Sequence, residues 1–362
     1  MKQGWEYKKF DEVFNLQMGK TPDRKNPDYF GGKNVWITIR DLGNKEVSES
    51  NEHITDKAVS DTNIRKVKKG TVIMSFKLTL GKCGIAARDL YTNEAIMAFN
   101  TKEGYDINSS FLYYYLQCYN WKGSNKAVMG ITLNKATISK HHINIPPKST
   151  QLSIVSELDK INELIRLKKE QLKDYDNLAQ SIFYEMFGDP VENEKGWEVK
   201  KLKDVYKLKS GDSLSAKNFN EGNIPVYGGN GISGFHNQYN KDGKFIIIGR
   251  VGVYCGNARI VKGKFWLTDN AFELLYDNSI QNEIFVCALL QHLNLRQYAN
   301  AAAQPVISNS TLKDIKITLP PLPLQHLFAQ RIEQIERQKS AVQKSITDLE
   351  TLLASRMQYW FE

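Results

Sequence analysis

The stretch Gly4–Gly19, GWEYKKFDEVFNLQMG, returns at Gly196–Gly211 as GWEVKKLKDVYKLKSG. Eight of the sixteen positions are identical, all at a constant offset of 192 residues. A chain of 362 residues is long enough for two ordinary domains, each with its own core. The repeat therefore predicts two related domains, each opened by the same segment.

A second repeat closes each domain. INIPPKSTQLSIVSELDKINELI, which begins at Ile143, aligns with ITLPPLPLQHLFAQRIEQIERQK, which begins at Ile317, at an offset of 174. The change of offset makes the second domain shorter by about eighteen residues. A weaker echo inside the domains links TNEAIMAF (92–99) with TDNAFELLY (268–276). The predicted order is domain, helix, domain, helix.

Each closing repeat leads into a heptad pattern. Seam residues step by four and three from Ile154 to Met186 and again from Phe328 to Trp360, which is the spacing of a coiled coil. The proline doublets mark where these helices begin. Each predicted helix of 33 residues extends about 50 Å. Because neither helix can hide its stripe alone, we expect them to pair antiparallel within the chain; a coiled coil between two separate chains is the alternative.

Three cationic residues interrupt these seams, namely Lys168, Lys339 and Arg356. We expect them to fix the register or to meet acidic residues, at some loss of stability. Arg356 lies close to the end of the second helix. We therefore also expect a partner to complete the packing there.

Short β-branched runs bounded by Gly, Asn and Asp, such as KGTVIMSF and GKFIIIGRVGVYCG, predict strands and tight turns within the domains. FLYYYLQCY (111–119) and EIFVCALLQHL (283–293) predict buried helices. The predicted fold class is mixed α/β or α+β, with two globular domains in a pseudo-twofold arrangement. The predicted boundaries are 1–150 and 188–323 for the domains, and 151–187 and 324–362 for the helices.

The chain carries 49 Lys and Arg against 40 Asp and Glu, a net charge of +9. Five basic and seven acidic residues lie in 151–187, and five of each in 324–362, so the positive excess lies in the globular domains. This balance favours an anionic partner such as nucleic acid, although many soluble proteins are as basic. The four cysteines form no metal or disulfide pattern, and neither a signal peptide nor a membrane span is evident. We expect a cytoplasmic protein.

Several motifs resemble catalytic sites without their context. Gly229, Gly231 and Gly234 have the spacing of a dinucleotide loop, but no helical pattern follows. Asn144 before Pro146 and Pro147 lacks the aromatic residue of amino-methyltransferases, and Asp242-Gly-Lys244 has no well-placed upstream carboxylate. His141 and His142 are adjacent, so their side chains point in different directions. We predict no catalytic site, no metal and no cofactor in this chain.

The candidate DNA-binding residues are long donors and acceptors in glycine- and proline-bearing loops. In the first domain they are Lys20, Thr21, Arg24, Lys25, Arg40, Lys77 and Lys82. In the second they are Lys217, Tyr227, Asn230, Arg250, Tyr254, Arg259, Gln304 and Asn309. The last two stand where the first domain has Gly130 and Lys135. That divergence predicts that the two domains read different sequences.

The duplicated GWExKKLxDV-like opening and the closing I-x-[IL]-P-P segment before a heptad helix resemble the specificity subunit of type I restriction–modification systems. GKTPDRKNPDYFGGKNVWITIRDL and IPVYGGNGISGFHNQY also resemble two subclasses of that family's target recognition domains. The resemblance spans essentially the whole chain. It implies two target recognition domains separated by an antiparallel helix pair that acts as a ruler.

The resemblance further implies that the chain binds a split sequence in double-stranded DNA. Two methyltransferase subunits would methylate an adenine in each half with S-adenosylmethionine, and ATP-dependent restriction subunits would cut unmodified DNA. These cofactors are expected on the partner subunits. Two alternatives remain: a DNA-modifying enzyme, nuclease or methyltransferase, with an unrecognised active site, and a coiled-coil structural scaffold.

Overall fold

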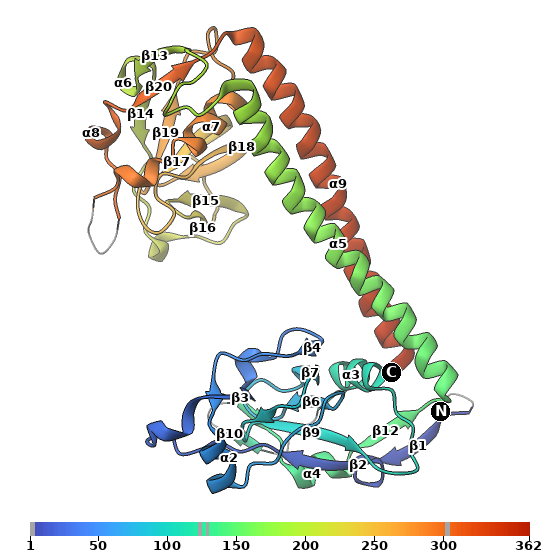
Figure 1. Cartoon of the computed structure of the whole chain (residues 1–362). Coiled ribbons are helices and arrows are strands. Elements are labelled where there is room, and N and C mark those ends of the chain that lie inside the picture. The colour runs from blue at the N-terminus through green and yellow to red at the C-terminus, as the bar shows by residue number, and fades with distance from the viewer. Residues whose placement is uncertain (1–3, 122–124, 128–129, 301–304) are drawn as a thin grey trace. The chain divides into compact units, whose positions relative to one another are not determined.

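The computed structural model describes residues 4–121, 125–127, 130–300 and 305–362, with only the backbone described at 125–127 and 130–132. The chain divides into two compact units (Figure 1). Unit 1 consists of Met1–Leu167 with Ser345–Glu362, and unit 2 of Lys168–Lys344. Each long helix therefore contributes to both units. The division into four segments stays a prediction of the sequence.

Unit 1 combines short helices with several small sheets. Before the first long helix its elements are β1 (Glu6–Lys9), α1 (Phe10–Val13), β2 (Phe14–Met18), η1 (Pro27–Tyr29), β3 (Phe30–Ile37), η2 (Ile39–Asp41), β4 (Glu46–Val47), β5 (His53–Ile54), α2 (Asp56–Thr62), β6 (Val72–Ser75), β7 (Cys83–Ala86), β8 (Tyr91–Thr92), β9 (Ile96–Thr101), α3 (Ser109–Cys118), β10 (Asn125–Ala127), β11 (Gly130–Thr132), α4 (Lys135–Lys140) and β12 (His142–Ile145). The long helix α5 (Lys148–Phe187) follows.

Unit 2 repeats this plan with fewer and longer strands. Its elements are β13 (Glu198–Lys201), α6 (Leu202–Val205), β14 (Lys207–Ser210), η3 (Ala216–Asn218), β15 (Ile224–Gly228), β16 (Gly231–His236), β17 (Lys241–Gly249), β18 (Ala258–Leu267), β19 (Ala271–Leu275), α7 (Glu283–His292), η4 (Leu295–Tyr298), α8 (Asn309–Leu312) and β20 (Lys316–Leu319). The second long helix, α9 (Leu322–Phe361), closes the chain. α5 and α9 each begin one residue after a proline doublet, as the sequence predicted.

The two sequence repeats meet as a pair of strands in each unit. β1, from the opening repeat, pairs antiparallel with β12, from the closing repeat, so that Glu6 faces Ile145. β13 pairs with β20 in the same register, and Glu198 faces Leu319. The opening segment therefore pairs with the strand that leads into the long helix, which explains why the two motifs occur together.

The central sheets share a common arrangement. The five-stranded sheet of unit 1 has the order β2-β9-β6-β7-β4, and the six-stranded sheet of unit 2 has the order β14-β19-β17-β18-β15-β16. In both, the strand from the opening repeat lies next to the strand of the weaker echo. The buried helices α3 and α7 pack in the cores beside these sheets. The predicted mixed α/β class and the repeated domains are confirmed.

Every position of the two predicted seams is buried or half-buried. In unit 1, the Nη2 atom of Arg356 lies 3.1 Å from Oε2 of Glu157. In unit 2, Nζ of Lys339 lies 2.7 Å from Oδ1 of Asp176. The earlier residue of α5, Glu157, meets the later residue of α9, Arg356, and the later residue of α5, Asp176, meets the earlier residue of α9, Lys339. The two helices therefore pair antiparallel within the chain, as predicted.

The cationic seam residues have partners close by. Arg356 and Lys339 meet the carboxylates expected of them, whereas Lys168 donates to the side-chain amide of Gln171 at 3.1 Å. The end of α9 packs on the core of unit 1, where Phe361 lies 5.8 Å from Phe111 between ring centroids. The expectation that a partner must complete the packing there is therefore wrong. Among the described residues, no helix has the length and apolar character needed to cross a membrane.

Candidate nucleic-acid interface

A glycine at the end of the first sheet strand determines where a candidate loop begins in each unit. A Cβ atom on Gly19 would lie 2.2 Å from the carbonyl oxygens of Thr92 and Asn93. A Cβ atom on Gly211 would lie 2.4 Å from the carbonyl oxygens of Leu267 and Thr268, at the end of β18. No side chain fits at such distances. Gly19 and Gly211, which end the two copies of the opening repeat, are therefore required by a close backbone approach.

The first candidate loop is anchored through Lys20. The indole N–H of Trp36 donates to the carbonyl oxygen of Lys20 at 3.1 Å. The Lys20 ammonium donates to the carbonyl oxygen of Thr62 at 2.6 Å. Lys20 is exposed but engaged, and the adjacent Thr21 is half-buried. The structure thus gives Lys20 an intramolecular role at the root of the loop.

Further along this loop, Arg24 and Lys25 differ in their surroundings. The Arg24 guanidinium lies 5.2 Å from the ring centroid of Trp36 and pairs with Glu52 at 2.6 Å. Lys25 is exposed, and its ammonium has no ion pair among the residues described. Lys25 is therefore the freer cation for an anionic partner.

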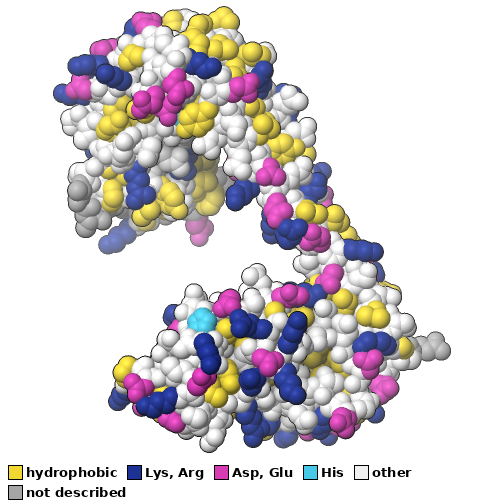
Figure 2. Space-filling model, viewed as in Figure 1, with side chains coloured by type: hydrophobic (Ala, Val, Ile, Leu, Met, Phe, Trp, Pro, Cys, Tyr) yellow, Lys and Arg dark blue, Asp and Glu magenta, His cyan; other side chains and the backbone are white. Residues whose placement is uncertain are grey.

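The other cationic candidates of unit 1 lie on two separate turns. Arg40 is exposed in η2. Lys77 and Lys82 flank the loop between β6 and β7, and Nζ of Lys77 lies 5.6 Å from the ring centroid of Phe76. On the face of unit 1 drawn in Figure 2, Lys and Arg side chains alternate with acidic ones. The cations there do not form one unbroken patch.

In unit 2, glycine-rich turns border a hollow of about 450 Å³ and bring two candidates near one another. Asn230 lines it, and its Oδ1 atom would lie 3.2 Å from a Cβ atom on Gly252. Gly231 has a φ of +104°, and a Cβ atom there would lie 2.5 Å from Nη1 of Arg259. The Arg259 guanidinium therefore packs against the turn that presents Asn230. This is the arrangement in which the structure best unites the sequence candidates.

Arg250 is engaged inside unit 2. Its Nη1 atom donates to the carbonyl oxygen of Asp269 at 3.1 Å and contacts Oγ of Ser210 at 3.4 Å. Its guanidinium lies 4.8 Å from the ring centroid of Phe272, and its Nε is buried with no partner among the described atoms. These contacts join three strands and make Arg250 an anchor of the loop that it begins.

The remaining candidates of unit 2 are dispersed. Lys217 is exposed in η3, and Tyr254 is exposed at the tip of the loop after β17. Tyr227 packs edge-on against Phe265, with 5.4 Å between ring centroids. Asn309 donates from its side chain to the carbonyl oxygen of Leu208 at 3.3 Å. Gln304 lies outside the described residues. For all fifteen candidates, contact with DNA stays a prediction.

The loops after β6 and β17 also carry two exposed apolar residues. The sequence candidates did not include them, because only side chains able to form hydrogen bonds or ion pairs with DNA were considered. Leu78 follows Lys77 in unit 1, and Val253 precedes Tyr254 in unit 2. Leu78 could have been found from the sequence, because the offset of 174 residues between the closing repeats aligns it with a glycine, Gly252.

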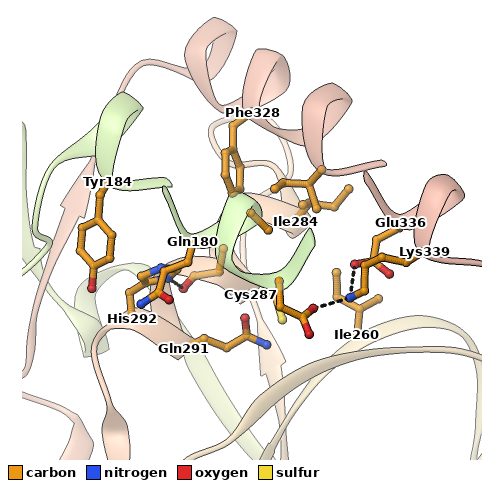
Figure 3. Close-up of a pocket in the computed structure, with 14 residues that line it drawn as sticks. Gln180, Tyr184, Ile260, Ile284, Cys287, Gln291, His292, Phe328, Glu336 and Lys339 are labelled. Atoms are coloured by element: carbon orange, nitrogen blue, oxygen red, sulfur yellow. Dashed lines mark hydrogen bonds and ion pairs between the residues drawn. The ribbon is translucent and has the colours of Figure 1, made fainter. Parts of the chain in front are cut away.

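Unit 2 also contains a groove of about 600 Å³ between α5, α7 and α9 (Figure 3). It is lined by Cys287 and His292, the residue types of a thiol enzyme. Burial raises the pKa of the Cys287 thiol to about 12, so the thiol stays protonated at neutral pH. Nδ1 of His292 lies 2.7 Å from the carbonyl oxygen of Ala288 and must therefore carry its proton. The thiol is therefore not set up as a nucleophile, and Nε2 of His292, which is left unprotonated in the neutral ring, is buried with no partner among the described atoms.

The catalytic look-alikes of the sequence also separate in space. The ring of His142 stacks on Tyr7 at 4.4 Å, whereas Nδ1 of His141 lies 3.0 Å from the hydroxyl of Tyr119. Lys244, from the Asp242-Gly-Lys244 motif, forms an ion pair with Glu283 of α7. Within the described part of the chain, no group of three or more His, Cys, Asp or Glu side chains is arranged to hold a metal. The GxGxxG spacing leads into strand β16, as expected, and not into a helix.

Known proteins resemble this chain along most of its length. A family model described as the type I restriction modification DNA specificity domain matches residues 2–174 and 194–351. The MjaIX type I restriction enzyme specificity subunit of Methanocaldococcus jannaschii is 27% identical over 394 residues, covering 96% of this chain and 90% of the relative. The EcoprrI specificity subunit of Escherichia coli is 26% identical over 382 residues, covering 97% and 91%.

Solved structures share the fold. The S subunit of a type I restriction–modification system from M. genitalium has a TM-score of 0.56 at 16% identity, covering 99% of this chain and 96% of that one. A chain from a study of complex assembly and conformational transition of the type I R-M system has a TM-score of 0.66 at 16% identity, covering 99% and 98%.

Proposed function

This chain belongs to the type I restriction–modification DNA specificity family, and from that premise we propose that it recognises a DNA target in two parts, one read by each unit. The main support for the proposal is that the two units repeat the same structural arrangement. Both units have the paired terminal strands and the close-packed glycine before the first candidate loop. The separation of the two parts stays a prediction, drawn from the length of the heptad segments.

The two units are expected to read different sequences. The first loop of unit 1 carries Lys25 and Arg24, whose guanidinium lies over the ring of Trp36, whereas unit 2 has Asn230 at the glycine-lined hollow and Arg259 against the adjacent Gly231 turn. Arginine favours guanine, and asparagine favours adenine, in the major groove. Different side chains on a shared frame support two unlike half-sites.

The proposal includes partner subunits. Two methyltransferase subunits would methylate an adenine in each half-site with S-adenosylmethionine, and ATP-dependent restriction subunits would join them. The repeat supports two equivalent docking positions, because each unit presents the same strand pair and the same two helices beside a buried helix. A cytoplasmic location is also part of the proposal, and the four unpaired cysteines support it.

We propose that the chain itself is not catalytic. The protonated state of the Cys287 thiol and the dispersal of the motifs that resemble catalytic sites support this. A DNA-modifying enzyme with its own active site is the second candidate, and it requires turnover by the purified chain alone. A structural scaffold is the third, and it requires that DNA affinity be absent.

Mapping of methylated adenines in cells with and without this chain tests the main proposal. We expect methylation at a two-part sequence that disappears when the chain is absent and changes in one half when one unit is exchanged. An unchanged methylation pattern would contradict the proposal. Cleavage or methylation by the purified chain alone would favour the second candidate.

A further inference from the structure

The loops after β6 and β17 are built on the same hydrogen bonds. Each loop is closed by a backbone bond across its base, and each entry residue accepts a bond from a segment far along the chain. The matching pairs are Ser75 N to Lys82 O (2.9 Å) with Gly249 N to Asn257 O (3.1 Å), and Leu133 N to Phe76 O (3.1 Å) with Ile307 N to Arg250 O (2.8 Å). The two loops therefore occupy equivalent places in the two units.

Leu78 adopts a left-handed backbone conformation at the position where unit 2 has a glycine. Its φ is +62°, and Gly252, 174 residues later, has a φ of +85°. A bulky side chain is strained in this region, whereas glycine is not. The loop imposes the conformation, because Oγ of Ser75 accepts from the backbone N–H of Lys82 at 3.1 Å and donates to the carbonyl oxygen of Thr79. Unit 1 keeps a leucine where a glycine would be less strained.

Burial does not compensate for this strain. The Leu78 residue is 64% exposed and belongs to none of the apolar clusters formed by the described residues. Val253 and Tyr254, at the tip of the equivalent loop, are each 58% exposed. Strained residues that the fold does not need are typical of binding sites. Both loops thus expose large, mainly apolar side chains at their tips.

The residues beside Leu78 indicate the kind of partner. Lys77 and Lys82 lie at the two ends of the loop and suit a phosphate backbone. A leucine side chain has no donor or acceptor, so it can contact a base only through apolar atoms. Thymine offers a methyl group in the major groove, and an unstacked base step offers ring faces. A leucine between lysines fits a DNA duplex better than an apolar protein surface.

We propose, resting on the proposed function, that Leu78 makes an apolar contact with a base in the half-site read by unit 1. Val253 and Tyr254 form the equivalent tip in unit 2. The loop leaves the Leu78 residue 64% exposed, while the two lysines hold the flanking phosphates. Leu78 is thereby a specificity-determining residue.

The test uses the full chain assembled with its methyltransferase subunits and a duplex bearing the target found by methylation mapping. Leu78→Ala removes the apolar group, and Leu78→Gly also removes the backbone strain. We expect both variants to lose about tenfold or more in affinity for the target with unchanged affinity for non-specific duplex, and Leu78→Gly to melt no lower than the unsubstituted chain. Leu275→Ala, which truncates a 43% exposed leucine in unit 2, is the matched control and should bind the target normally.

Three results would overturn the inference. Full target affinity in both variants would show that Leu78 contacts no base. An equal loss on target and non-specific duplex would show a role at the phosphates, and a loss of methyltransferase association would show a protein partner. If the unsubstituted complex binds target and non-specific duplex equally well, the proposed function itself is wrong. If only the Leu78 variants lose affinity for the target, the proposed function is unaffected.

The two sources of apolar contact are then separated. Replacing each thymine of the half-site by uracil weakens the unsubstituted complex but not Leu78→Ala if a thymine methyl is the contact. 2-Aminopurine fluorescence rises with the unsubstituted complex but not with Leu78→Ala if a base step is unstacked. Either response supports the inference, and the absence of both overturns it.

Discussion

The side-chain oxygen of Gln151 accepts a hydrogen bond from the backbone N–H of Asn108, with 2.8 Å between the two atoms. Asn108 is the N-cap of α3, and Gln151 lies in the first turn of α5, so this bond ties the buried helix to the long one. Gln325 makes the same bond to Asn282, the N-cap of α7, at 2.8 Å. The glutamine shared by the two closing repeats is thus a buried joint in each unit.

Replacing Gln151 by leucine should destabilise unit 1. The change leaves the backbone N–H of Asn108 and the carbonyl oxygen of Pro146 without their partner. We expect the free energy of unfolding to fall by about 1–3 kcal/mol, measured by urea denaturation. Gln325→Leu should do the same in unit 2, and the exposed Gln330→Leu is the control. Equal stability of Gln151→Leu and the unsubstituted chain would contradict the prediction.

Alanine at Gly19 should disrupt the root of the first candidate loop. Its Cβ would lie 2.2 Å from two carbonyl oxygens, so the backbone must shift, at a loss of about 1–3 kcal/mol. Gly43→Ala is the control, because no atom lies within 4 Å of its Cβ position. Thermal melting should show the difference, and methylation should weaken for one half-site only. For unit 2 the matched pair is Gly211→Ala with Gly228→Ala, whose nearest contact is 3.5 Å.

Arg259 and Arg250 should respond differently to alanine. Arg259 packs on the Gly231 turn beside the hollow. If Arg259 contacts a base, Arg259→Ala should weaken DNA binding by about 1–3 kcal/mol; if it contacts a phosphate, the slope of log affinity against log salt concentration should fall by about one. Arg250→Ala should chiefly lower the melting temperature, because its guanidinium joins three strands. Lys262→Ala, exposed on the same strand as Arg259, is the control. If Arg250→Ala binds DNA more weakly but melts at the same temperature as the unsubstituted chain, Arg250 contacts DNA directly and the prediction is wrong.

The ion pair between Arg356 and Glu157 should make stability depend on pH. The hydrogen bond from Arg356 holds the pKa of Glu157 below its ordinary value of 4.5, and burial acts in the opposite direction. A carboxylate with a lowered pKa stabilises the folded state above its unfolded pKa, and this contribution is lost as the pH falls through the folded pKa. The difference in melting temperature between the unsubstituted chain and Glu157→Gln should be largest near neutral pH and vanish in acid. A difference that is constant with pH would mean that packing, and not charge, is lost in the variant.

Prediction from the sequence succeeded where the pattern is local. A heptad stripe repeats within one helix, so the buried positions of α5 and α9 could be identified without any partner. The same holds for Gly19 and Gly211, which stand out because the chain contains two copies of one frame. It failed at the end of α9, because the aromatic contact of Phe361 is made with Phe111, far away in the chain.

The candidate site was less predictable than the fold. Composition selected Arg250 for its chemistry, but Ser210 of β14, Phe272 of β19 and Asp269 of the turn before β19 engage its guanidinium. Leu78 was overlooked because an isolated leucine carries no signal until its backbone angle and exposure are known.

The duplicated arrangement and the two heptad helices can be read from the amino-acid sequence alone, because a repeat is a match between two sequence segments and a heptad is a spacing within one segment. The folded chain was needed to show that β1 pairs with β12, that Arg259 packs against the Gly231 turn beside Asn230, and that Leu78 is strained and exposed. These relationships join segments separated by many residues. Hydrogen bonding and close packing across such separations depend on the folded backbone, which local spacing does not specify.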